Sequence, residues 1–568
     1  MISLHVSWLA PIHGLEQATS NVCSFASADC GTRPRPAKSS HYIRRCAAAH
    51  RPRRTRRFGR VRRAILPRGD ELWCAKPLWI RRECANLCVF ACVRGRTGAH
   101  KGHRDMVLRN VVVTLTAAGV MFLVACDPGD PPPAGAGAAG GAGGSAEPGC
   151  PAPSGGPTVH SGDVSDNETW TAEGSPHVVS FPVRLRPGVT LTIEPCAEVL
   201  LEEDTGISAM DEGAELKAEG TEARPITFRG SEGARWNDVH VAWPGKATLR
   251  HVTLEGGGGD RFHANAALSA YGGSVTPAAP VLLVDHVTVR GSLGAGVLLL
   301  RASAFAEGST DLVITESGSE EHPYPLELGE QALGSIPVGV YTGNRRDEIL
   351  IQDEGANQTS GLQQDTTLRD RGVPYHFGDW RDARFNIGGG GEGAPLTTLT
   401  IEPGVTIRFE PGNFMQIEHF TGDFAASGAL RALGTPEKPI VFTSAAEAPA
   451  PGDWGGLWFG GIPRDENVLE NVIVEYAGYD CGCILLSCND LTTFNGAVIF
   501  SQAPSSAFIQ GSTFRHVAGH GVTRGWNGTA GPDFVSGNTF EDVSGCEQTR
   551  PWVEGQPCPD PKPPCPEG

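Results

Sequence analysis

The sequence predicts an all-β protein whose short strands wind into a parallel solenoid, and two observations support this. First, one long phrase occurs twice: residues 191–228 begin with Leu-Thr-Ile-Glu-Pro and end with Pro-Ile-Thr-Phe, and residues 399–442 begin with the same five residues and end with Pro-Ile-Val-Phe. Second, strand-sized apolar runs are interrupted every few residues by Gly, Asn, Asp or Pro. A long repeat of short strands and tight turns is typical of stacked β proteins.

A β-sandwich array would also contain such strands, but smaller echoes favour the solenoid. Residues 511–517 (Gly-Ser-Thr-Phe-Arg-His-Val) resemble residues 537–543 (Gly-Asn-Thr-Phe-Glu-Asp-Val), about 26 residues later. One coil of a parallel β-helix needs a length of that order. Similar phrases on successive coils would stack about 4.8 Å apart, so that equivalent apolar residues form ladders inside the coil.

Charge divides the chain into two unequal parts. Residues 1–105 carry 21 Lys and Arg against 6 Asp and Glu, whereas the remaining residues carry 26 against 58. An Arg-rich segment could bind nucleic acid. Because Met106 opens an export signal of its own, we instead expect residues 1–105 to be an untranslated or disordered basic extension, and we discount Cys84, Cys88 and Cys92 as metal ligands. The acidic remainder argues against nucleic acid as a partner.

Residues 106–125 have the features of an export signal. A short start with one Arg is followed by about 15 apolar residues, Val111–Ala125, too few to span a bilayer comfortably. The segment ends in Leu123-Val-Ala-Cys126, which resembles the lipobox of bacterial lipoproteins. That resemblance implies lipidation of Cys126, with an ordinary secretory signal as the alternative. We expect the anchor in the outer membrane or at the cell surface rather than in the inner membrane, although Asp127 resembles an inner-membrane retention signal of enteric bacteria.

Beyond Cys126 the chain continues with a flexible tether and a set of cysteines. Residues 126–157 are rich in Gly, Ala and Pro and carry too little apolar surface to fold. Eight cysteines follow, an even number in an oxidising compartment, so disulfides are the expectation and zinc binding the less favoured alternative. They are Cys150, Cys196, Cys481, Cys483, Cys488, Cys546, Cys558 and Cys565. The first two could pair near one end, and the others could staple a cap.

The phrasing of residues 399–478 resembles a known family. Leu-Thr-Ile-Glu-Pro-Gly-Val-Thr-Ile-Arg-Phe, Gly-Asp-Trp-Gly-Gly-Leu and Val-Glu-Tyr-Ala-Gly occur there in order. They are similar to predicted lipoproteins and surface proteins, common in myxobacteria, with right-handed parallel β-helix repeats. The resemblance covers roughly residues 160–545 and implies a right-handed coil and export, without one activity. The first copy departs from it at Cys196, where the second has Gly404, and at residues 237–238, where the second has Gly455-Gly456.

We therefore expect two repeated β-helix stretches, residues 158–345 and 346–548, with a break near residues 388–391. A Pro- and Cys-rich tail, residues 549–568, would follow.

Chemistry on such a scaffold is hard to locate in the sequence. Parallel β-helix enzymes that cleave acidic polysaccharides use clustered Asp residues with a Gly-His-Gly phrase, or Ca²⁺ held by Asp. Gly519-His520-Gly521 is present, with His516 four residues before it, but no paired Asp precedes it. A turn between strands explains the same residues. We therefore name no catalytic residue and keep His516, His520, Trp454 and Trp458 as candidates for a binding groove.

Cofactors are not predicted with any specificity. Acidic runs at 202–204, 211–212 and 320–321 could bind Ca²⁺, but we favour the interpretation that they are solvated surface acids. Trp236 and Trp454 recur at matched positions, which favours packing over sugar stacking. The predicted function is a lipid-anchored module that binds a polysaccharide or a cell-surface protein. A polysaccharide lyase or glycoside hydrolase is the alternative, and a purely structural spacer is the third possibility.

Overall fold

The structure is a computed structural model that describes residues 149–273, 277–354, 361–378, 383–388, 395–421, 424–481, 495–526, 531–551 and 565, together with four short strands near the N-terminus. The chain divides into two units, Met1–Gly137 and Ala138–Gly568. In the first unit β1 (Glu71–Cys74) pairs with β4 (Cys92–Gly95), and β2 (Leu78–Arg82) pairs with β3 (Ala85–Val89), both antiparallel. The signal and lipidation segment, including Cys126, lies outside the described residues, as do Cys483, Cys488 and Cys558.

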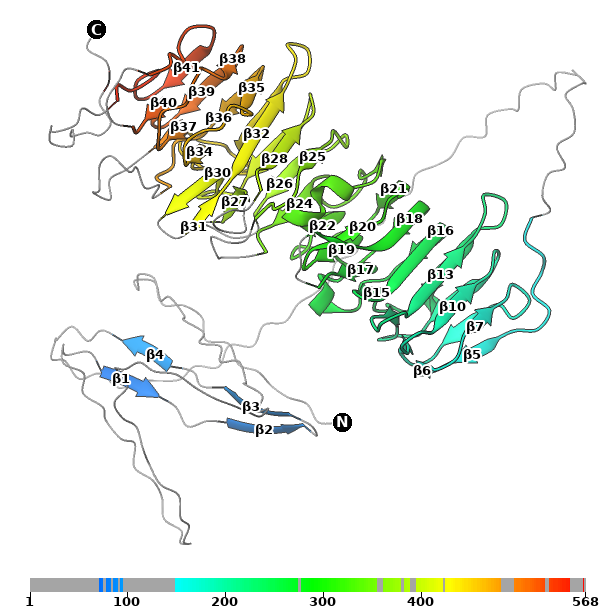
Figure 1. Cartoon of the computed structure of the whole chain (residues 1–568). Helices are drawn as coiled ribbons and strands as arrows, with labels where there is room; N and C mark the ends of the chain where they lie inside the picture. Colours follow the sequence, from blue (N-terminus) through cyan, green and yellow to red (C-terminus); the bar gives the residue numbers. More distant parts are fainter. Residues whose placement is uncertain are drawn as a thin grey trace, which may run out of the picture. The chain divides into compact units, whose positions relative to one another are not determined.

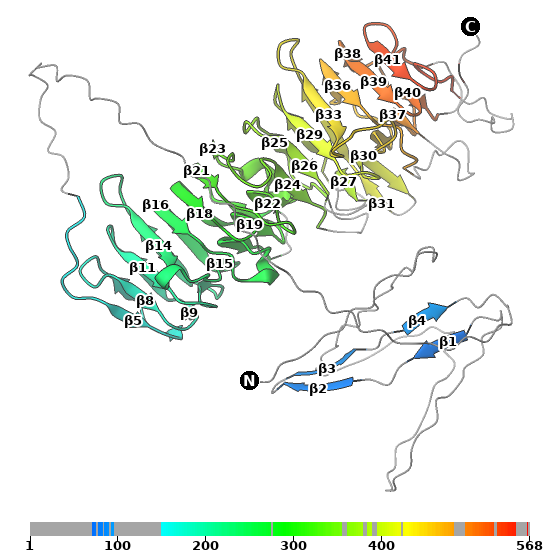
Figure 2. The same cartoon turned by 180° about the vertical axis from the view of Figure 1, so that it is seen from behind.

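In the second unit each coil contributes up to three short strands, and each strand pairs with its equivalent on the next coil. The coil of β10 (Thr190–Ile193), β11 (Glu198–Leu201) and β12 (Ile207–Ala209) stacks on that of β13 (Glu215–Glu219), β14 (Ile226–Gly230) and β15 (Val239–Ala242). The pairing is parallel and in register. Figure 1 shows the coils following one another in sequence order from β5 to β41, and Figure 2 shows the same succession from behind.

Alternation along each strand explains why these residues form it. In β10 and β11 buried and partly exposed residues alternate, as expected for strands with one face on a core. The inward residues stack into ladders. Val199, Phe228, Leu254, Val289 and Ile314 occupy one such ladder on five successive coils, and each is fully buried. One continuous apolar cluster extends from Val164 to Phe534.

Among the described residues of this unit, the strands form four sheets. The first, of 12 strands, comprises β5 (Thr158–His160), β7 (Glu168–Trp170), β8 (His177–Val179), β10, β11, β13, β14, β16 (Lys246–Glu255), β18 (Ala279–Arg290), β20 (Ser303–Phe305), β21 (Thr310–Thr315) and β23 (Gly339–Val340). The second, of 14 strands, comprises β6 (Asp163–Val164), β9 (Val183–Leu185), β12, β15, β17 (Leu268–Tyr271), β19 (Val297–Leu300), β22 (Leu326–Gly329), β24 (Ile349–Gln352), β26 (Tyr375–Phe377), β29 (Thr406–Phe409), β33 (Ile440–Ser444), β36 (Val472–Glu475), β39 (Thr513–Val517) and β41 (Thr539–Val543).

The two smaller sheets belong to the C-terminal half. The six-stranded sheet comprises β27 (Arg384–Ile387), β30 (Phe414–Thr421), β31 (Phe424–Ala426), β34 (Leu457–Gly460), β37 (Gly496–Phe500) and β40 (His520–Arg524), and β31 alone pairs antiparallel there. The five-stranded sheet comprises β25 (Thr366–Leu368), β28 (Thr397–Ile401), β32 (Gly428–Leu433), β35 (Val468–Glu470) and β38 (Ile509–Gln510).

The two halves of the repeat use different sheets for equivalent strands. β11 and β29 both follow the Leu-Thr-Ile-Glu-Pro phrase, yet β11 belongs to the 12-stranded sheet and β29 to the 14-stranded sheet. The change occurs where β24, a third strand of its coil, stacks on β26, a second strand. The 14-stranded sheet is therefore continuous through the middle of the unit, whereas the 12-stranded sheet ends at β23. The predicted break at residues 388–391 is described only at Gly388.

Some turns between strands require left-handed backbone, and one of them contains Cys196, where the second copy of the repeat has Gly404. Gly404 has φ +91°, and Cys196 at the matched position has φ +74°. A side chain in this region is disfavoured unless the surroundings hold it. Cys196 is held by a disulfide to Cys150. The turn is thus the same in both copies.

These observations confirm the predicted all-β parallel β-helix. Helical structure among the described residues is limited to three short 3₁₀ segments: η1 (Ser231–Gly233), η2 (Arg261–His263) and η3 (Glu330–Ser335). In the described part of the chain, no helix has the length and apolar character needed to cross a membrane.

Candidate functional site

The strongest candidate site lies on the outer side of β15 and β17, on two neighbouring coils. His240 in β15 stands beside Ser269 in β17, in register. Their neighbours along the strands, including Val239 and Val241, point into the core and are fully buried. Since side chains alternate along a strand, His240 and Ser269 face outward.

The chain that follows β16 covers these outward residues. Four glycines at 256–259 lead into the single turn η2, where Asp260 accepts a hydrogen bond from the backbone N–H of Phe262 at 2.8 Å. This cap orients the turn so that the imidazole of His263 stacks on that of His240, with ring centroids 4.3 Å apart and planes within 5°.

A buried carboxylate ties the cluster together. Asp238 is 5% exposed and accepts hydrogen bonds from the Nδ1–H of His263 at 2.8 Å and from the hydroxyl of Ser269. Because Ser269 gives its proton to Asp238, its oxygen accepts from the Nδ1–H of His240, 2.7 Å away. His263 also lies 3.3 Å from a carboxylate oxygen of Asp260. Buried polar groups are thus paired with one another, as stability requires.

The two imidazoles have opposite protonation preferences. Burial lowers the pKa of His240 to about 4, although Asp238 acts in the other direction, so His240 is neutral at pH 7. Burial also acts against the charged form of His263. There the hydrogen bond and charge of Asp238, with the charge of Asp260, outweigh burial and raise the pKa. The cluster therefore combines a neutral imidazole, a cation-favouring imidazole and two carboxylates.

Aromatic side chains surround this network. The ring of Tyr271 meets both imidazoles edge-on at 5.2 Å, and its hydroxyl donates to the backbone oxygen of Phe262 at 3.3 Å. The guanidinium of Arg301 lies over the Tyr271 ring, 4.9 Å from its centroid. Trp243, whose backbone N–H donates to the oxygen of Tyr271 at 2.8 Å, is 52% exposed, and Phe262 is 76% exposed. Large exposed aromatics beside a rigid polar network are characteristic of binding surfaces.

The second copy of the repeat shows that the scaffold does not need these polar groups. At the position of His240 it has Trp458, at that of Ser269 it has Ile499, and at that of Asp238 it has Gly456. There Phe414, Trp458 and Ile499 form a small apolar cluster. The polar and aromatic cluster around Tyr271 is therefore specific to the first copy, and it includes the second departure from the repeat, at residues 237–238.

A metal ion does not fit the cluster as it stands. The ligand atoms of Asp238, His240 and His263 lie within 4.8 Å of one another. A metal bound by an imidazole lies close to the plane of that ring, and two parallel stacked rings cannot both direct their lone pairs at one ion. Ser269 also occupies the space between Asp238 and His240. At His520, Cys546 and Cys565, the second such group, the cysteines are joined as a disulfide and offer no thiolate.

The residues singled out in the sequence have other surroundings. Trp454 is fully buried and stacks on Phe409 at 4.4 Å, while Trp458 is 5% exposed and donates its Nε1–H to Ser501 at 2.9 Å. His516 faces Asp542 at 2.9 Å, and His520 receives the backbone N–H of Cys546 at 3.1 Å. These two histidines bind different partners. A side chain at Gly521 would meet the ring of Phe540 at 2.4 Å, which explains the glycine by packing.

Cysteines and acidic runs also find partners. Cys150 pairs with Cys196 as suggested, Cys546 pairs with Cys565, and Cys481 is also in a disulfide. The acids considered for Ca²⁺ face basic groups in two cases. Asp211 forms an ion pair with Arg184 at 2.8 Å, and Glu320 lies 3.5 Å from Arg345.

A second charged cluster lies where the 14-stranded sheet passes from one half to the other. His376 is completely buried and donates both ring N–H groups, one to Glu348 at 2.8 Å and one to Glu410 at 3.0 Å. Arg408 and Arg346 also pair with Glu348. Burial opposes charge on His376, but the two carboxylates outweigh it and raise the pKa. Its groups satisfy one another, so we interpret it as a structural clamp.

Sequence reasoning missed Trp243, Phe262 and the polar network beneath them. Of the four groove candidates, Trp454 recurs as Trp236 and is buried, whereas Trp458, His516 and His520 are not repeated in the first copy. The signal that could have found the missed residues is a difference between the two copies. Residues 237–243, Asn-Asp-Val-His-Val-Ala-Trp, differ from residues 455–461, Gly-Gly-Leu-Trp-Phe-Gly-Gly, at every outward position.

Comparison with known proteins supports the fold and leaves the activity open. Residues 387–478 match a family model described as a pectate-lyase like beta helix domain. No curated protein matches the chain significantly. The solved structures likewise contain no significant match. The matched segment lies in the second copy of the repeat, outside the cluster around Tyr271.

Proposed function

We propose that this chain is an exported, lipid-anchored β-helix protein that binds polysaccharide through the cluster around Tyr271 and does not cleave it. One observation carries this proposal: Trp243 and Phe262, whose backbones are hydrogen-bonded to Tyr271, expose large aromatic surfaces, and Trp243 is replaced by Gly461 in the other copy of the repeat. The match of residues 387–478 to a pectate-lyase like domain is consistent with a polysaccharide-related role.

The chemistry of sugars suits this surface. The C–H face of a sugar ring packs on an aromatic face, and its hydroxyls need donors and acceptors held in place. Trp243 and Phe262 offer the first, and the partly exposed imidazole of His263 offers the second. Because η2 and Tyr271 are fixed by hydrogen bonds, little freedom would be lost on binding.

The carboxylates favour binding over hydrolysis. Cleavage of a glycosidic bond by two acids needs one protonated acid and one free carboxylate on opposite sides of the bond. Asp238 is committed to Ser269 and His263, and Asp260 caps η2. Both are therefore engaged in holding the cluster together.

A polysaccharide lyase or hydrolase is the second candidate, and one observation favours it. His240 is held neutral by burial, in the form that can accept a proton. If a sugar reached its ring edge, His240 could serve as a base.

Export and anchoring are supported by different features. The apolar segment 111–125 and Cys126 provide the anchor, and the acidic body disfavours nucleic acid. The disulfide between Cys150 and Cys196 fits an oxidising compartment. The partners are then a membrane, through lipid, and an extended polysaccharide at the outer membrane or cell surface.

A glycan array with the full chain tests the proposal. Trp243→Ala should abolish binding to the glycans that wild type retains. Phe181→Ala is the matched control, because Phe181 is also exposed, at 64%, and lies on another coil. Undiminished binding by Trp243→Ala would refute the assignment of the site. Release of new reducing or unsaturated ends from a bound polysaccharide would instead support the enzyme.

A further inference from the structure

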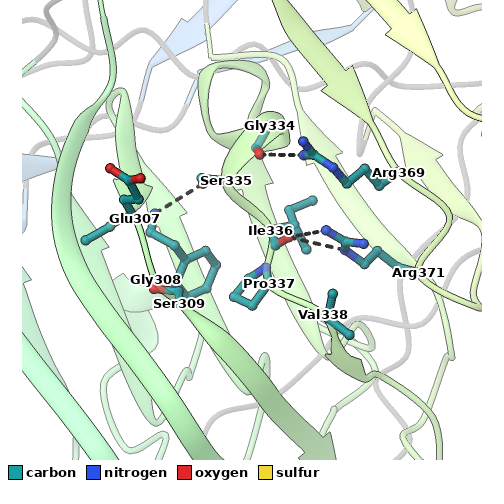
Figure 3. A pocket seen from close by; sticks show the side chains of 12 residues that line it. Glu307, Gly308, Ser309, Gly334, Ser335, Ile336, Pro337, Val338, Arg369 and Arg371 are labelled. Carbon is teal, nitrogen blue, oxygen red and sulfur yellow. Dashed lines mark hydrogen bonds between the residues drawn. The ribbon is translucent and has the colours of Figure 1, made fainter.

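A cavity of about 280 Å³ lies at another corner of the coil, where the 12-stranded sheet ends. Three successive coils line it, through the turn at Glu307–Ser309, the segment Gly334–Val338 after η3, and Arg369 with Arg371 (Figure 3). Its volume is close to the lower limit for small-molecule sites, enough for one sugar ring.

The cavity is a consequence of the change of sheet. β23 has only two residues and pairs with β21 on one side, and no strand of the 12-stranded sheet follows it in the described part of the chain. Arg369 donates to the backbone oxygen of Gly334 at 3.1 Å, and Arg371 donates to that of Ile336 through Nε at 3.2 Å and Nη2 at 2.6 Å. The two arginine side chains thus bind backbone carbonyls close to the end of the 12-stranded sheet.

The two guanidiniums make this wall cationic in an otherwise acidic body. A guanidinium carries five N–H donors in a plane, more than one carbonyl can accept, and its fork matches a carboxylate. Figure 3 shows Glu307 on the side away from the two arginines. Pro337 and Val338 form an apolar part of the lining, and Val338 is 62% exposed.

The lining therefore has three chemical parts: donors for an anion, an apolar surface, and the carboxylate of Glu307 with the hydroxyl of Ser309. The hydroxyl of Ser335 is engaged within the protein, since it donates to Ala332 and accepts from the backbone N–H of Phe305.

Nε of Arg369 lies 3.9 Å from a carboxylate oxygen of Glu402. Arg371 binds the backbone oxygen of Ile336, so a neutral sugar would leave this guanidinium without an anionic ligand. A simple inorganic anion would use neither the apolar surface nor Glu307. A sugar that carries a carboxylate uses all three.

We propose that this cavity binds one carboxylated sugar unit, with the carboxylate at Arg369 and Arg371, the ring against Pro337 and Val338, and hydroxyls toward Glu307 and Ser309. The inference takes the class of ligand from the proposed function but uses a different site. The unit could be part of a polysaccharide or a free sugar acid, and these share the recognised chemistry.

Calorimetric titration of the full chain with glucuronate, glucose and a glucuronate oligosaccharide tests the proposal. Glucuronate should bind at least about tenfold more tightly than glucose, which corresponds to about 1.4 kcal/mol. Tighter binding of the oligosaccharide identifies a polymer as the source, and equal binding identifies the free acid. Equal affinities for glucose and glucuronate, or binding of neither, would overturn the proposal.

Variants separate this site from the cluster around Tyr271. Arg371→Gln should weaken glucuronate binding about tenfold, and Arg371→Lys, which keeps the charge, should weaken it less. Arg290→Gln is the matched control, because Arg290 is a partly exposed arginine that pairs with Glu255 and does not line the cavity. Melting curves establish that each variant is folded. Trp243→Ala should leave glucuronate binding unchanged, so the proposal for the cavity can fail or hold independently of the proposal for the cluster around Tyr271. An unchanged affinity in folded Arg371→Gln would overturn the assignment.

Discussion

Trp236 and Trp454, at matched positions of the repeat, donate their indole N–H groups to matched backbone oxygens. Trp236 donates to Glu255 and Trp454 to Glu475, each at 2.8 Å, and both indoles are fully buried. The acceptors are the last residues of β16 and β36. The recurrence of tryptophan therefore reflects a packing requirement of the coil.

Removal of either buried indole should cost stability by the same mechanism. Trp236→Ala and Trp454→Ala should each lower the free energy of unfolding by about 3–5 kcal/mol, because each leaves a cavity and an unpaired carbonyl. Trp243→Ala, on the surface, should change it by less than about 0.5 kcal/mol. Denaturant titration measures all three. Equal losses at Trp243 and Trp236 would contradict the distinction between surface and core.

The turn at Cys196 allows the effect of the disulfide to be separated from that of backbone conformation. Cys196→Gly and Cys196→Ala both remove the link to Cys150, which spans 46 residues of sequence. Only glycine keeps the left-handed φ without strain, so Cys196→Ala should be less stable than Cys196→Gly by about 1 kcal/mol. Thermal unfolding of the two variants side by side gives the difference. Equal stabilities would mean that the turn relaxes once the disulfide is lost.

The buried imidazole of His240 predicts acid sensitivity. Its folded-state pKa, about 4, lies below the unfolded value of 6.5, so protons favour the unfolded chain. The contribution of neutral His240 to the free energy of unfolding is fully present above pH 6.5. It is lost as the pH falls toward 4, by about 3 kcal/mol in total. His263, whose pKa is raised, adds a constant amount below pH 6.5.

Unfolding measured from pH 7 to pH 4 should therefore show a smaller loss of stability in His240→Leu than in wild type. The comparison is needed because burial also lowers the pKa of His160 to about 4. Parallel curves for the two proteins would show that His240 is not held neutral.

The charged clamp at His376 should lose its contribution to folding stability as the pH rises, whereas His240 loses its contribution as the pH falls. The pKa of His376 is raised, so its contribution is present below pH 6.5 and is lost as the pH rises through the folded-state value. Burial acts to raise the pKa of Glu348, but the hydrogen bond and charge of His376, with the charges of the arginines, outweigh burial and lower that pKa. The hydrogen bond from His376 lowers the pKa of Glu410. The contributions of both carboxylates to folding stability are therefore lost at acid pH. The clamp is thus most effective between about pH 4.5 and 6.5.

His376→Leu should destabilise the protein by about 3 kcal/mol at pH 6, since Glu348 then stays buried with fewer partners. His516→Asn, at an ion pair that is 41% exposed on the histidine side, should cost less than about 1 kcal/mol. Denaturant titration at pH 6 and pH 8 compares them. A cost at His376 that is no larger than at His516 would rule out the clamp.

The sequence predicted those features of the fold that follow from the repeated phrases, and it did not predict those that do not repeat. The coil follows from matched phrases, since inward residues such as Val199 and Phe228 must stack on like residues. The change of sheet between β24 and β26 could not be predicted, because the inward residues are apolar on every face and either stacking buries them. His240 and Trp243 were missed because the proposed site lies where the first copy differs, and one sequence does not distinguish a functional difference from drift.

We propose that the exposed aromatics beside Tyr271 hold a polysaccharide. Affinity electrophoresis of wild type and Trp243→Ala through gels that contain the best-bound polysaccharide tests it most directly. Wild type and Phe181→Ala should be strongly retarded, and Trp243→Ala should migrate as it does in a gel without polysaccharide. Equal retardation of wild type and Trp243→Ala would contradict it.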